Sequence, residues 1–313
     1  MPLAPAAEAF ACPRGCRFPA VRGIPRFVSS DNYAAAFGSQ WKAFRKTQLD
    51  SFTGTTITRD RLTRCLGGSI EGVRGKLVLE AGCGAGRFTE LLIAAGARVF
   101  ACDLSEAVEA NFENCGASPG YFVCQANITS LPVSPGQFDY VICLGVLQHT
   151  PDPEAALAAL AANVRPGGWL IVDHYTGDRP LRPTQAALRW ALLKCPPRFT
   201  LAFCAAITSA LWPLHRLCWR ARNSKARLTA LARRTFLNVS PILDYQYTYP
   251  SLGPALLKAW AVLDTHDALT DRFKHSRTAD EIAATLRGLG LAPVVVSYGG
   301  NGVEARAQQT RHA

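Results

Sequence analysis

Residues 78–88, Val-Leu-Glu-Ala-Gly-Cys-Gly-Ala-Gly-Arg-Phe, decide the fold of this 313-residue chain. The apolar run that leads into the glycines is typical of a buried strand, and residues 88–93 continue with apolar side chains at helical spacing. Gly82, Gly84 and Gly86 lie between the two, where a missing Cβ lets the backbone turn sharply and approach a ligand closely. The stretch therefore predicts a strand, a ligand-binding turn and a helix.

The glycine spacing also argues against two common nucleotide-binding loops. A dinucleotide fingerprint starting at Gly82 requires glycine at position 87, which is Arg87, and a phosphate-binding loop requires a lysine that does not follow. The remaining pattern, E-x-G-x-G-x-G from Glu80, resembles motif I of the class I S-adenosylmethionine-dependent methyltransferases. An ordinary strand, turn and helix without a ligand is the alternative.

The next two predicted strands carry polar residues where this family binds the rest of its cofactor. Residues 98–103 form a buried strand ending in Asp103, about twenty residues beyond the glycines, where a carboxylate can accept from both ribose hydroxyls. Residues 121–124 form a third strand, and Asn127 follows at a position where the family often has an acid facing the adenine amino group. An amide oxygen can also accept from that amine, so the resemblance holds there.

Two further motifs follow in the family's order. Residues 138–149 match the fourth strand and its loop, and residues 163–172 match a turn and the fifth strand, with an alanine-rich helix from Pro153 between them. The resemblance implies a Rossmann-like α/β fold with a mostly parallel sheet. Residues 292–306 are expected to add a terminal antiparallel hairpin.

The same resemblance implies S-adenosylmethionine as the cofactor. The residues expected to bind it lie in the glycine turn and at the ends of the next strands. They are Glu80, Gly82, Cys83, Gly84, Asp103, Leu104, Asn127, Ile128 and Leu144.

The first sixty residues are expected to form a separate segment. Cys12 and Cys16 have the spacing of half a zinc ribbon, but no second cysteine pair follows, so no metal site is expected. Residues 23–41 resemble the N-terminal segment of a bacterial subgroup of the family, in which a degenerate ribbon leads into a helix over the cofactor. That resemblance implies that Gln40 and Trp41 line the cofactor pocket. The alternative is that the tryptophan packs on the core.

One segment carries the whole excess of positive charge, which is +11 for the chain. Residues 179–243 contain no aspartate or glutamate and twelve basic side chains: Arg179, Arg182, Arg189, Lys194, Arg198, Arg216, Arg220, Arg222, Lys225, Arg227, Arg233 and Arg234. Prolines at both ends predict a helical insertion after the fifth strand. Its basic, tryptophan-rich composition fits a lid over the acceptor site or a surface on an anionic membrane, with RNA binding a weaker reading. The uncharged run 199–214 is too short to span a bilayer, and Pro213 is expected to interrupt it.

The chain is thus expected to have four parts. They are an N-terminal segment with the cofactor-covering helix (1–60), the cofactor-binding core (61–175), the basic insertion (176–265), and the last helix and hairpin that complete the core (266–313). Four of the eleven cysteines fall in predicted core strands or the turn, where cysteine behaves as a small hydrophobic residue. A reduced cytoplasmic location is expected, since residues 1–11 lack a secretory pattern. A peripheral position at the inner face of the membrane is the alternative.

Methyl transfer to a hydroxyl needs a base, for which histidine is suited. His149 follows the fourth strand, at the sheet edge where such folds bind ligands, and His174 follows the fifth. The third candidate is His266 with Asp267 beside it, in a polar stretch before the last helix. For each histidine, a structural role is equally open.

These observations predict a methyltransferase that acts on a small-molecule, lipid-linked or sugar-linked acceptor, with oxygen as the accepting atom. An RNA methyltransferase lacks support, because no N/D-P-P-Y/F tetrapeptide and no RNA-binding module is present. A non-catalytic methyltransferase-like binding subunit is the other alternative, since fold does not determine function. The acceptor and the oligomeric state are left open.

Overall fold

The computed structural model describes residues 9–11, 15–29, 31–116, 118–177, 181–300 and 302–310. The chain divides into two compact units. The core unit comprises Met1–Arg45, Thr56–Asp178 and Phe273–Ala313, and the helical unit comprises Lys46–Thr55 and Arg179–Arg272. The four-part division expected from the sequence stays a prediction.

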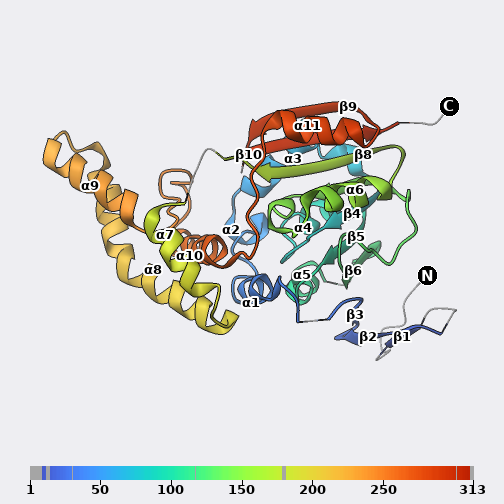
Figure 1. The fold of residues 1–313 in the computed structure, drawn as a ribbon, viewed down its shortest axis with the longest axis horizontal. Coiled ribbons are helices and arrows are strands. Elements are labelled where there is room, and N and C mark those ends of the chain that lie inside the picture. Colours follow the sequence, from blue (N-terminus) through green and yellow to red (C-terminus); the bar gives the residue numbers. More distant parts are fainter. Residues whose placement is uncertain are drawn as a thin grey trace. The chain divides into compact units, whose positions relative to one another are not determined.

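The core unit is built on a seven-stranded sheet with the order β6-β5-β4-β7-β8-β10-β9 (Figure 1). Its strands are β4 (Leu77–Ala81), β5 (Arg98–Asp103), β6 (Tyr121–Gln125), β7 (Phe138–Cys143), β8 (Val164–Tyr175), β9 (Leu291–Gly299) and β10 (Gly302–Gln309). The strands β4 to β8 pair in parallel, whereas β10 pairs antiparallel with both β8 and β9. The predicted Rossmann-like class I methyltransferase fold, with a mostly parallel sheet and a terminal antiparallel hairpin, is confirmed.

Helices cover both faces of this sheet, as its almost entirely apolar parallel strands require. The core unit's α-helices are α1 (Ala35–Ala43), α3 (Ile57–Cys65), α4 (Thr89–Ala94), α5 (Ala107–Cys115), α6 (Pro153–Asn163) and α11 (Ala279–Gly288). On one face, α6 and α11 pack on alternate strand residues such as Leu79 and Val141. On the other, α3, α4 and α5 pack on the intervening ones, such as Val78 and Ile142. The central strands β4 and β7 thus bury both of their sides, whereas the edge strand β9 is largely exposed.

The cysteines predicted to lie in the core are buried there as free thiols. Cys102, Cys124 and Cys143 are completely inaccessible to solvent in β5, β6 and β7, and Cys83 lies in the glycine turn. Burial raises the pKa of the Cys102 and Cys143 thiols well above the usual value. These side chains therefore act as small apolar packing groups.

A small sheet of β1 (Ala9–Ala11), β2 (Arg17–Val21) and β3 (Ile24–Pro25) precedes α1. It continues onto the end of β6, because the N–H of Phe27 donates to the carbonyl of Gln125 (2.8 Å) and Arg26 bonds the Gln125 side chain (3.2 Å). The zinc-ribbon resemblance cannot be followed at Cys12, which lies outside the described residues.

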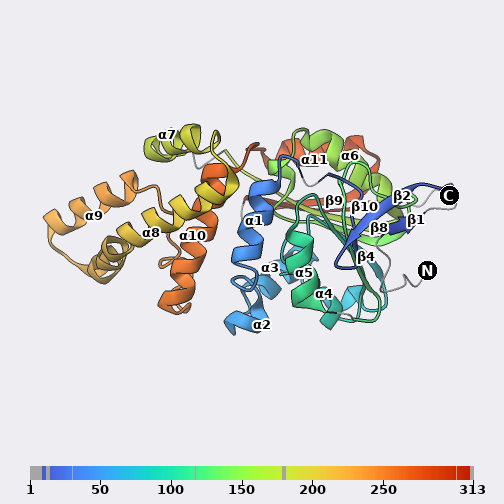
Figure 2. The ribbon, with the colours of Figure 1, turned by 90° about the horizontal axis from the view of Figure 1, so that it is seen from below.

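The helical unit contains α2 (Asp50–Thr53), α7 (Pro183–Leu192), α8 (Pro197–Arg220), α9 (Arg227–Val239) and α10 (Pro254–Thr270). Figure 2 shows α8 between α9 and α10. The ring of His215 joins α8 to the chain after α9, since Nδ1 lies 2.8 Å from Asp244 Oδ2 and Nε2 lies 2.8 Å from Ser240 Oγ.

The expected break at Pro213 is wrong. The helix α8 continues through this proline. The Pro213 ring is exposed to solvent, so the local distortion of the helix does not disturb the packing of a neighbouring element. The expectation that this segment is too short for a bilayer is therefore also wrong. Among the residues that the structure describes, Pro197–Asn223 is one helix with the length and composition to cross a membrane, a test that core helices of soluble proteins also pass.

Candidate functional site

The glycine turn after β4 lies against Val146, Trp41 and Cys102. Gly82 has a φ of +79°, and a Cβ there would lie 2.2 Å from Val146 Cγ2 in the loop after β7. Gly84 has a φ of +49°, and its Cβ would lie 3.4 Å from the Trp41 ring. The N–H groups of Gly82 and the next residue both donate to the carbonyl of Cys102 (2.8 and 2.9 Å). Any side chain at Gly82 would displace the loop after β7.

Asp103, at the end of β5, is aligned by the same turn. Its Oδ2 accepts from the N–H of Gly84 (2.9 Å), and its Oδ1 accepts from the N–H and the hydroxyl of Ser105 (2.8 and 2.7 Å). Burial raises the pKa of this carboxyl, and these three donors oppose that effect. A carboxylate has about four acceptor positions, so the partly exposed side chain keeps room for a ligand hydroxyl. The ribose contact itself stays a prediction.

Glu80 lies beneath the turn as a buried carboxyl. Its Oε2 accepts from the hydroxyl of Thr89 (2.6 Å), and Oε1 has no partner among the described residues. Burial is the main reason that the Glu80 pKa rises to about 8. At neutral pH this side chain therefore exists mostly as the neutral acid.

We expect the Glu80→Gln variant to lose part of the pH dependence of folding stability. Because the Glu80 pKa is higher in the folded than in the unfolded protein, its contribution is fully present below pH 4.5 and is lost as pH rises through about 8. Each pH unit in this window costs up to about 1.4 kcal/mol. Melting temperatures measured from pH 5 to pH 9 should therefore fall less steeply in Glu80→Gln. The exposed Glu71→Gln is the control, and a slope equal to that of the wild type in Glu80→Gln would contradict the assignment.

The remaining residues expected to bind the cofactor lie around the same edge. Cys83, Ile128 and Leu144 are buried, and Leu104 follows β5 directly. Asn127 follows β6, but its Oδ1 accepts from the N–H and the hydroxyl of Thr129 (both 3.0 Å). In this arrangement Asn127 holds its own loop, and its contact with adenine stays a prediction.

The N-terminal helix α1 lies next to this turn. Trp41 lies against Gly84, while Gln40 is 1% exposed. Lys42 joins α1 to α5 through ion pairs with Glu106 (2.5 Å) and Glu109 (3.1 Å). Trp41 thus lies beside the glycine turn, and the expectation that Gln40 and Trp41 line the cofactor pocket stays a prediction.

An aromatic cluster surrounds His149 in the short helix η2 (Leu147–His149), beyond β7. The His149 ring lies 5.2 Å from that of Phe37 and 5.3 Å from that of Tyr175, between ring centroids. Its Nδ1 lies 3.3 Å from the carbonyl oxygen of Phe273, whose ring packs edge-on against Tyr33. Burial raises the Tyr33 pKa to about 12, so this phenol stays neutral. Sequence reasoning missed Tyr33, Phe37 and Phe273, which come from distant segments.

A buried ion pair supports the loop that leads to His149. Asp173, near the end of β8, accepts from the N–H of Gly145 (2.5 Å) and pairs with Arg61 of α3. Both side chains are largely buried. Sequence reasoning missed this pair too, although an acid near the end of a buried strand is a recognisable signal.

The other histidine candidates lie in interior positions. His266 is inaccessible within the helical unit, with Nε2 2.9 Å from the Thr200 hydroxyl, and burial lowers its pKa to about 4. His174 is 1% exposed, and burial lowers its pKa. These are positions typical of structural histidines, and a catalytic role for His266 stays a prediction.

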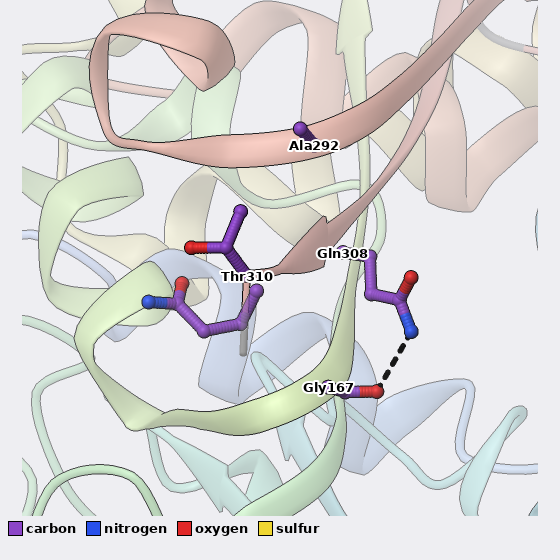
Figure 3. A pocket seen from close by; sticks show the side chains of 5 residues that line it. Gly167, Ala292, Gln308 and Thr310 are labelled. Carbon is purple, nitrogen blue, oxygen red and sulfur yellow. Dashed lines mark hydrogen bonds between the residues drawn. The ribbon is translucent and has the colours of Figure 1, made fainter. Parts of the chain in front are cut away.

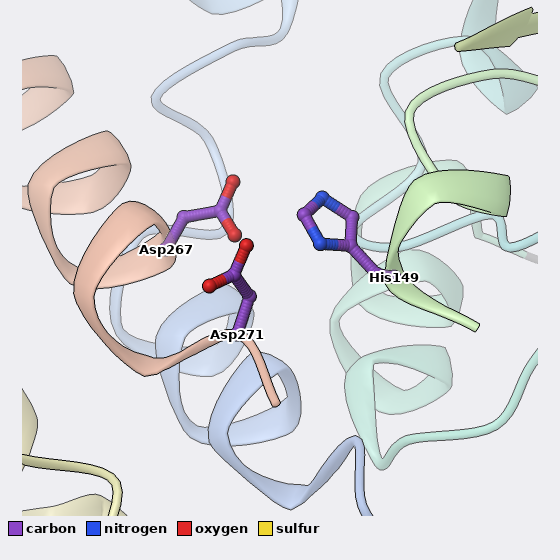
Figure 4. Close-up of side chains that lie close together, drawn as sticks. All are labelled: His149, Asp267 and Asp271. Atoms are coloured by element: carbon purple, nitrogen blue, oxygen red, sulfur yellow. The ribbon is translucent and has the colours of Figure 1, made fainter. Parts of the chain in front are cut away.

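Asp267 is the carboxylate that the sequence places beside His266. Figure 4 shows it one turn before Asp271 at the end of α10, and shows His149 on η2 of the core unit. Asp271 forms an ion pair with Arg189 of α7. Asp267 thus lies on a helix end that is anchored within the helical unit.

A pocket of about 420 Å³ lies elsewhere in the core unit (Figure 3). It is lined by Gly167, Ala292, Gln308, Gln309 and Thr310. Gly167 is near the start of β8, at the opposite edge of the sheet from the glycine turn. No candidate residue faces this pocket.

Comparison with known proteins gives the site its context. The family described as "Methyltransferase domain" matches residues 79–172. The chain is 39% identical over 163 residues to the ubiquinone biosynthesis O-methyltransferase of Thiobacillus denitrificans, covering 50% of this chain and 68% of that protein. It is 34% identical over 167 residues to the protein of that name from Aromatoleum aromaticum, covering 51% and 69%.

Solved structures of similar proteins include magnesium protoporphyrin IX methyltransferase from Synechocystis with bound S-adenosylmethionine. That structure has a TM-score of 0.40 and 16% identity, and the match covers 82% of this chain and 78% of that one.

The residues present fit S-adenosylmethionine as the cofactor. Gly82 and Gly84 have the positive φ values (+79° and +49°) that the glycine turn requires, and Asp103 is aligned by the turn with acceptor capacity to spare. The match covers more than two thirds of each of the two relatives. The strand order and the glycine turn indicate the same family. The chain belongs to the class I S-adenosylmethionine-dependent methyltransferases.

Proposed function

We propose that the protein transfers the methyl group of S-adenosylmethionine to a hydroxyl oxygen of a small-molecule acceptor, either free or linked to a lipid or sugar. The two relatives compared above are named O-methyltransferases, which supports oxygen as the accepting atom. Nothing in the sequence favours RNA as the acceptor, because charge alone does not identify it.

The observation that carries this proposal is the setting of His149. The loop that bears it contacts the glycine turn through Val146, so a base on this loop is near the cofactor-binding edge. The Phe273 carbonyl can only accept, which favours the Nδ1–H tautomer of His149 and leaves the basic lone pair on Nε2. The rings of Phe37 and Tyr175 give the histidine flat, apolar neighbours that suit a conjugated acceptor.

In the proposed mechanism the residues bind, orient and deprotonate. Bound S-adenosylmethionine supplies an electrophilic methyl group on its sulfonium. The glycine turn and Asp103 hold the cofactor, and Trp41 shields the turn from water. His149 Nε2 takes the proton from the acceptor hydroxyl, so that the oxygen attacks as a stronger nucleophile.

We expect His149→Ala to lower kcat by roughly 100-fold to 10,000-fold, which is the usual contribution of a general base. The dissociation constant of S-adenosylhomocysteine should stay unchanged, because the substitution leaves the glycine turn and Asp103 intact. With a phenolic acceptor, the defect should shrink as pH approaches about 10, where the acceptor ionises without help. Rate measurements across pH check this. A defect that is constant with pH would indicate a structural role for His149 instead. His174→Ala is the matched control and should leave the shape of the pH profile unchanged.

The proposed function is tested with labelled S-adenosylmethionine. The full-length protein is incubated with fractionated extracts, and lipid-soluble products are separated from water-soluble ones. Label in a methyl ether, which resists mild alkaline hydrolysis, supports O-methylation. Label only in amines, carboxyl esters or RNA contradicts it. Label in neither fraction, from a protein that binds S-adenosylhomocysteine, favours the non-catalytic alternative.

The place of action is part of the same proposal. We infer a cytoplasmic enzyme that acts free or at the inner face of the membrane. The buried, reduced cysteines and the basic helical unit support this inference.

A further inference from the structure

The helix α9 presents its apolar side to solvent. Leu228 is 81% exposed, Leu231 62% and Val239 51%. Spacings of three and eight residues place the three side chains on one face of a helix, with Thr235 between them. No residue of α9 is buried. An amphipathic helix in a folded unit normally turns this face inward, so the outward orientation requires an explanation.

The other side of α9 already packs on the helical unit. The Phe236 ring lies edge-on to His215 of α8, 5.0 Å between centroids, and Arg233 donates to the Tyr247 hydroxyl (3.4 Å). Thr184 of α7 donates to the carbonyl of Val239 (2.6 Å). These contacts fix the rotation of α9 about its axis. Its apolar face therefore cannot turn toward the interior of the helical unit.

Basic side chains border the apolar face. Arg227 and Arg234 lie on its edge and are exposed, and Lys225 precedes the helix. No acid occurs from residue 179 to residue 243. Such a surface complements a negatively charged partner that also has an apolar interior.

The neighbouring helices α7 and α8 also expose apolar side chains next to basic ones. Leu217 of α8 is 60% exposed, and Trp190 of α7 is 69% exposed. Lys194 lies 3.4 Å from the centroid of the Trp190 ring, and Arg222 lies 3.9 Å from that of Trp219. Tryptophan and cationic side chains together are typical of the boundary between lipid head groups and acyl chains.

We propose that α9 lies in the plane of an anionic membrane, with Leu228, Leu231 and Val239 among the acyl chains and Arg227 and Arg234 at the phosphates. Nucleic acid lacks an apolar layer for the leucines, and a second copy of this chain would bring two cationic surfaces together. This proposal adds a membrane partner to the proposed function. It rests on that function only for the face of the membrane that is bound, which is the cytoplasmic one. It predicts binding to lipid without any acceptor present.

The test uses the full-length protein and sedimentation with vesicles. Vesicles of phosphatidylcholine with about one third phosphatidylglycerol should bind the wild type at about 0.05 M salt, and high salt should release it. Pure phosphatidylcholine vesicles should retain little. The triple variant Leu228→Gln, Leu231→Gln, Val239→Gln should bind anionic vesicles at least roughly tenfold more weakly. The matched control, Tyr298→Gln, removes an equally exposed aromatic side chain from β9 and should bind as the wild type does.

Two outcomes overturn the proposal. One is that the wild type ignores anionic vesicles. The other is that the triple variant binds them as tightly as the wild type. Since α9 has no buried residue, the triple variant should keep its circular dichroism spectrum and its affinity for S-adenosylhomocysteine, which separates lost docking from lost folding. If sedimentation velocity shows that the variant disrupts a dimer while the wild type ignores vesicles, the face is a self-association surface and the membrane proposal fails. Transfer to a soluble acceptor without vesicles tests the proposed function independently.

Discussion

Asp103→Ala should weaken S-adenosylhomocysteine binding by about 1–3 kcal/mol, which corresponds to roughly 5-fold to 150-fold in the dissociation constant. The proposed bonds from the ribose hydroxyls to a charged acceptor are lost. The variant also removes the acceptor for the N–H of Gly84, so the glycine turn loses the contact that aligns it with β5. Isothermal calorimetry of the purified protein measures this effect directly.

Two controls separate these contributions. Ser105→Ala removes only the hydroxyl bond to Oδ1 (2.7 Å) and should cost little, because the backbone donors of Gly84 and Ser105 remain. Asp103→Asn keeps an oxygen acceptor without the charge and should give an intermediate affinity. Wild-type affinity in Asp103→Ala would show that the carboxylate only shapes the turn.

Asp173→Ala should lower the free energy of unfolding by about 3–5 kcal/mol, because it leaves the Arg61 guanidinium buried without its partner. The N–H of Gly145 loses its acceptor as well. A loss of this size lowers the melting temperature by roughly 6–20 °C for a domain of this kind. Thermal unfolding followed by circular dichroism checks the prediction. Cofactor affinity should fall too, since the same loop contacts Gly82 through Val146.

The double variant Arg61→Met, Asp173→Leu is the informative control. It removes both charges together, so it should be more stable than Asp173→Ala despite carrying two substitutions. Asp173→Asn keeps an acceptor for Gly145 and isolates the ionic part. If the double variant loses as much stability as the two single variants combined, Arg61 and Asp173 do not interact as described.

The local features of this fold could be predicted from the sequence. The turn at Gly82 and the strand ending in Asp103 depend on residues close together in the chain, where apolar runs and glycine spacing are informative. The start of α6 at Pro153 was predicted from the proline, which is typical of a first helical position. The structure adds the cap, since Asp152 accepts from the N–H groups of Glu154 and Ala155 (both 3.0 Å).

The features that depend on distant contacts could not be predicted. Arg61 and Asp173 are 112 residues apart, and nothing local pairs them. His266 was a candidate base because it lies beside Asp267 in a polar stretch, yet α8 buries its ring against Thr200. Pro213 was read as a break, because the sequence does not reveal that its side of α8 faces solvent. The apolar residues of α9 recur at helical spacing in the sequence. This spacing does not show whether the apolar face packs on the protein or faces solvent.

The free thiols inside the sheet give this enzyme a limited chemical lifetime outside a reducing environment. While the sheet is closed, Cys102, Cys124 and Cys143 are sealed from oxidants and electrophiles, and their raised pKa values suppress the reactive thiolate. We expect opening of the sheet to expose the three thiols, whose oxidation or cross-linking would then hinder refolding. We therefore expect unfolding to be reversible in the presence of a thiol reductant and progressively less reversible in air. The fraction of oxidised core thiols in a preparation kept in air should therefore rise with the number of times the sheet has opened.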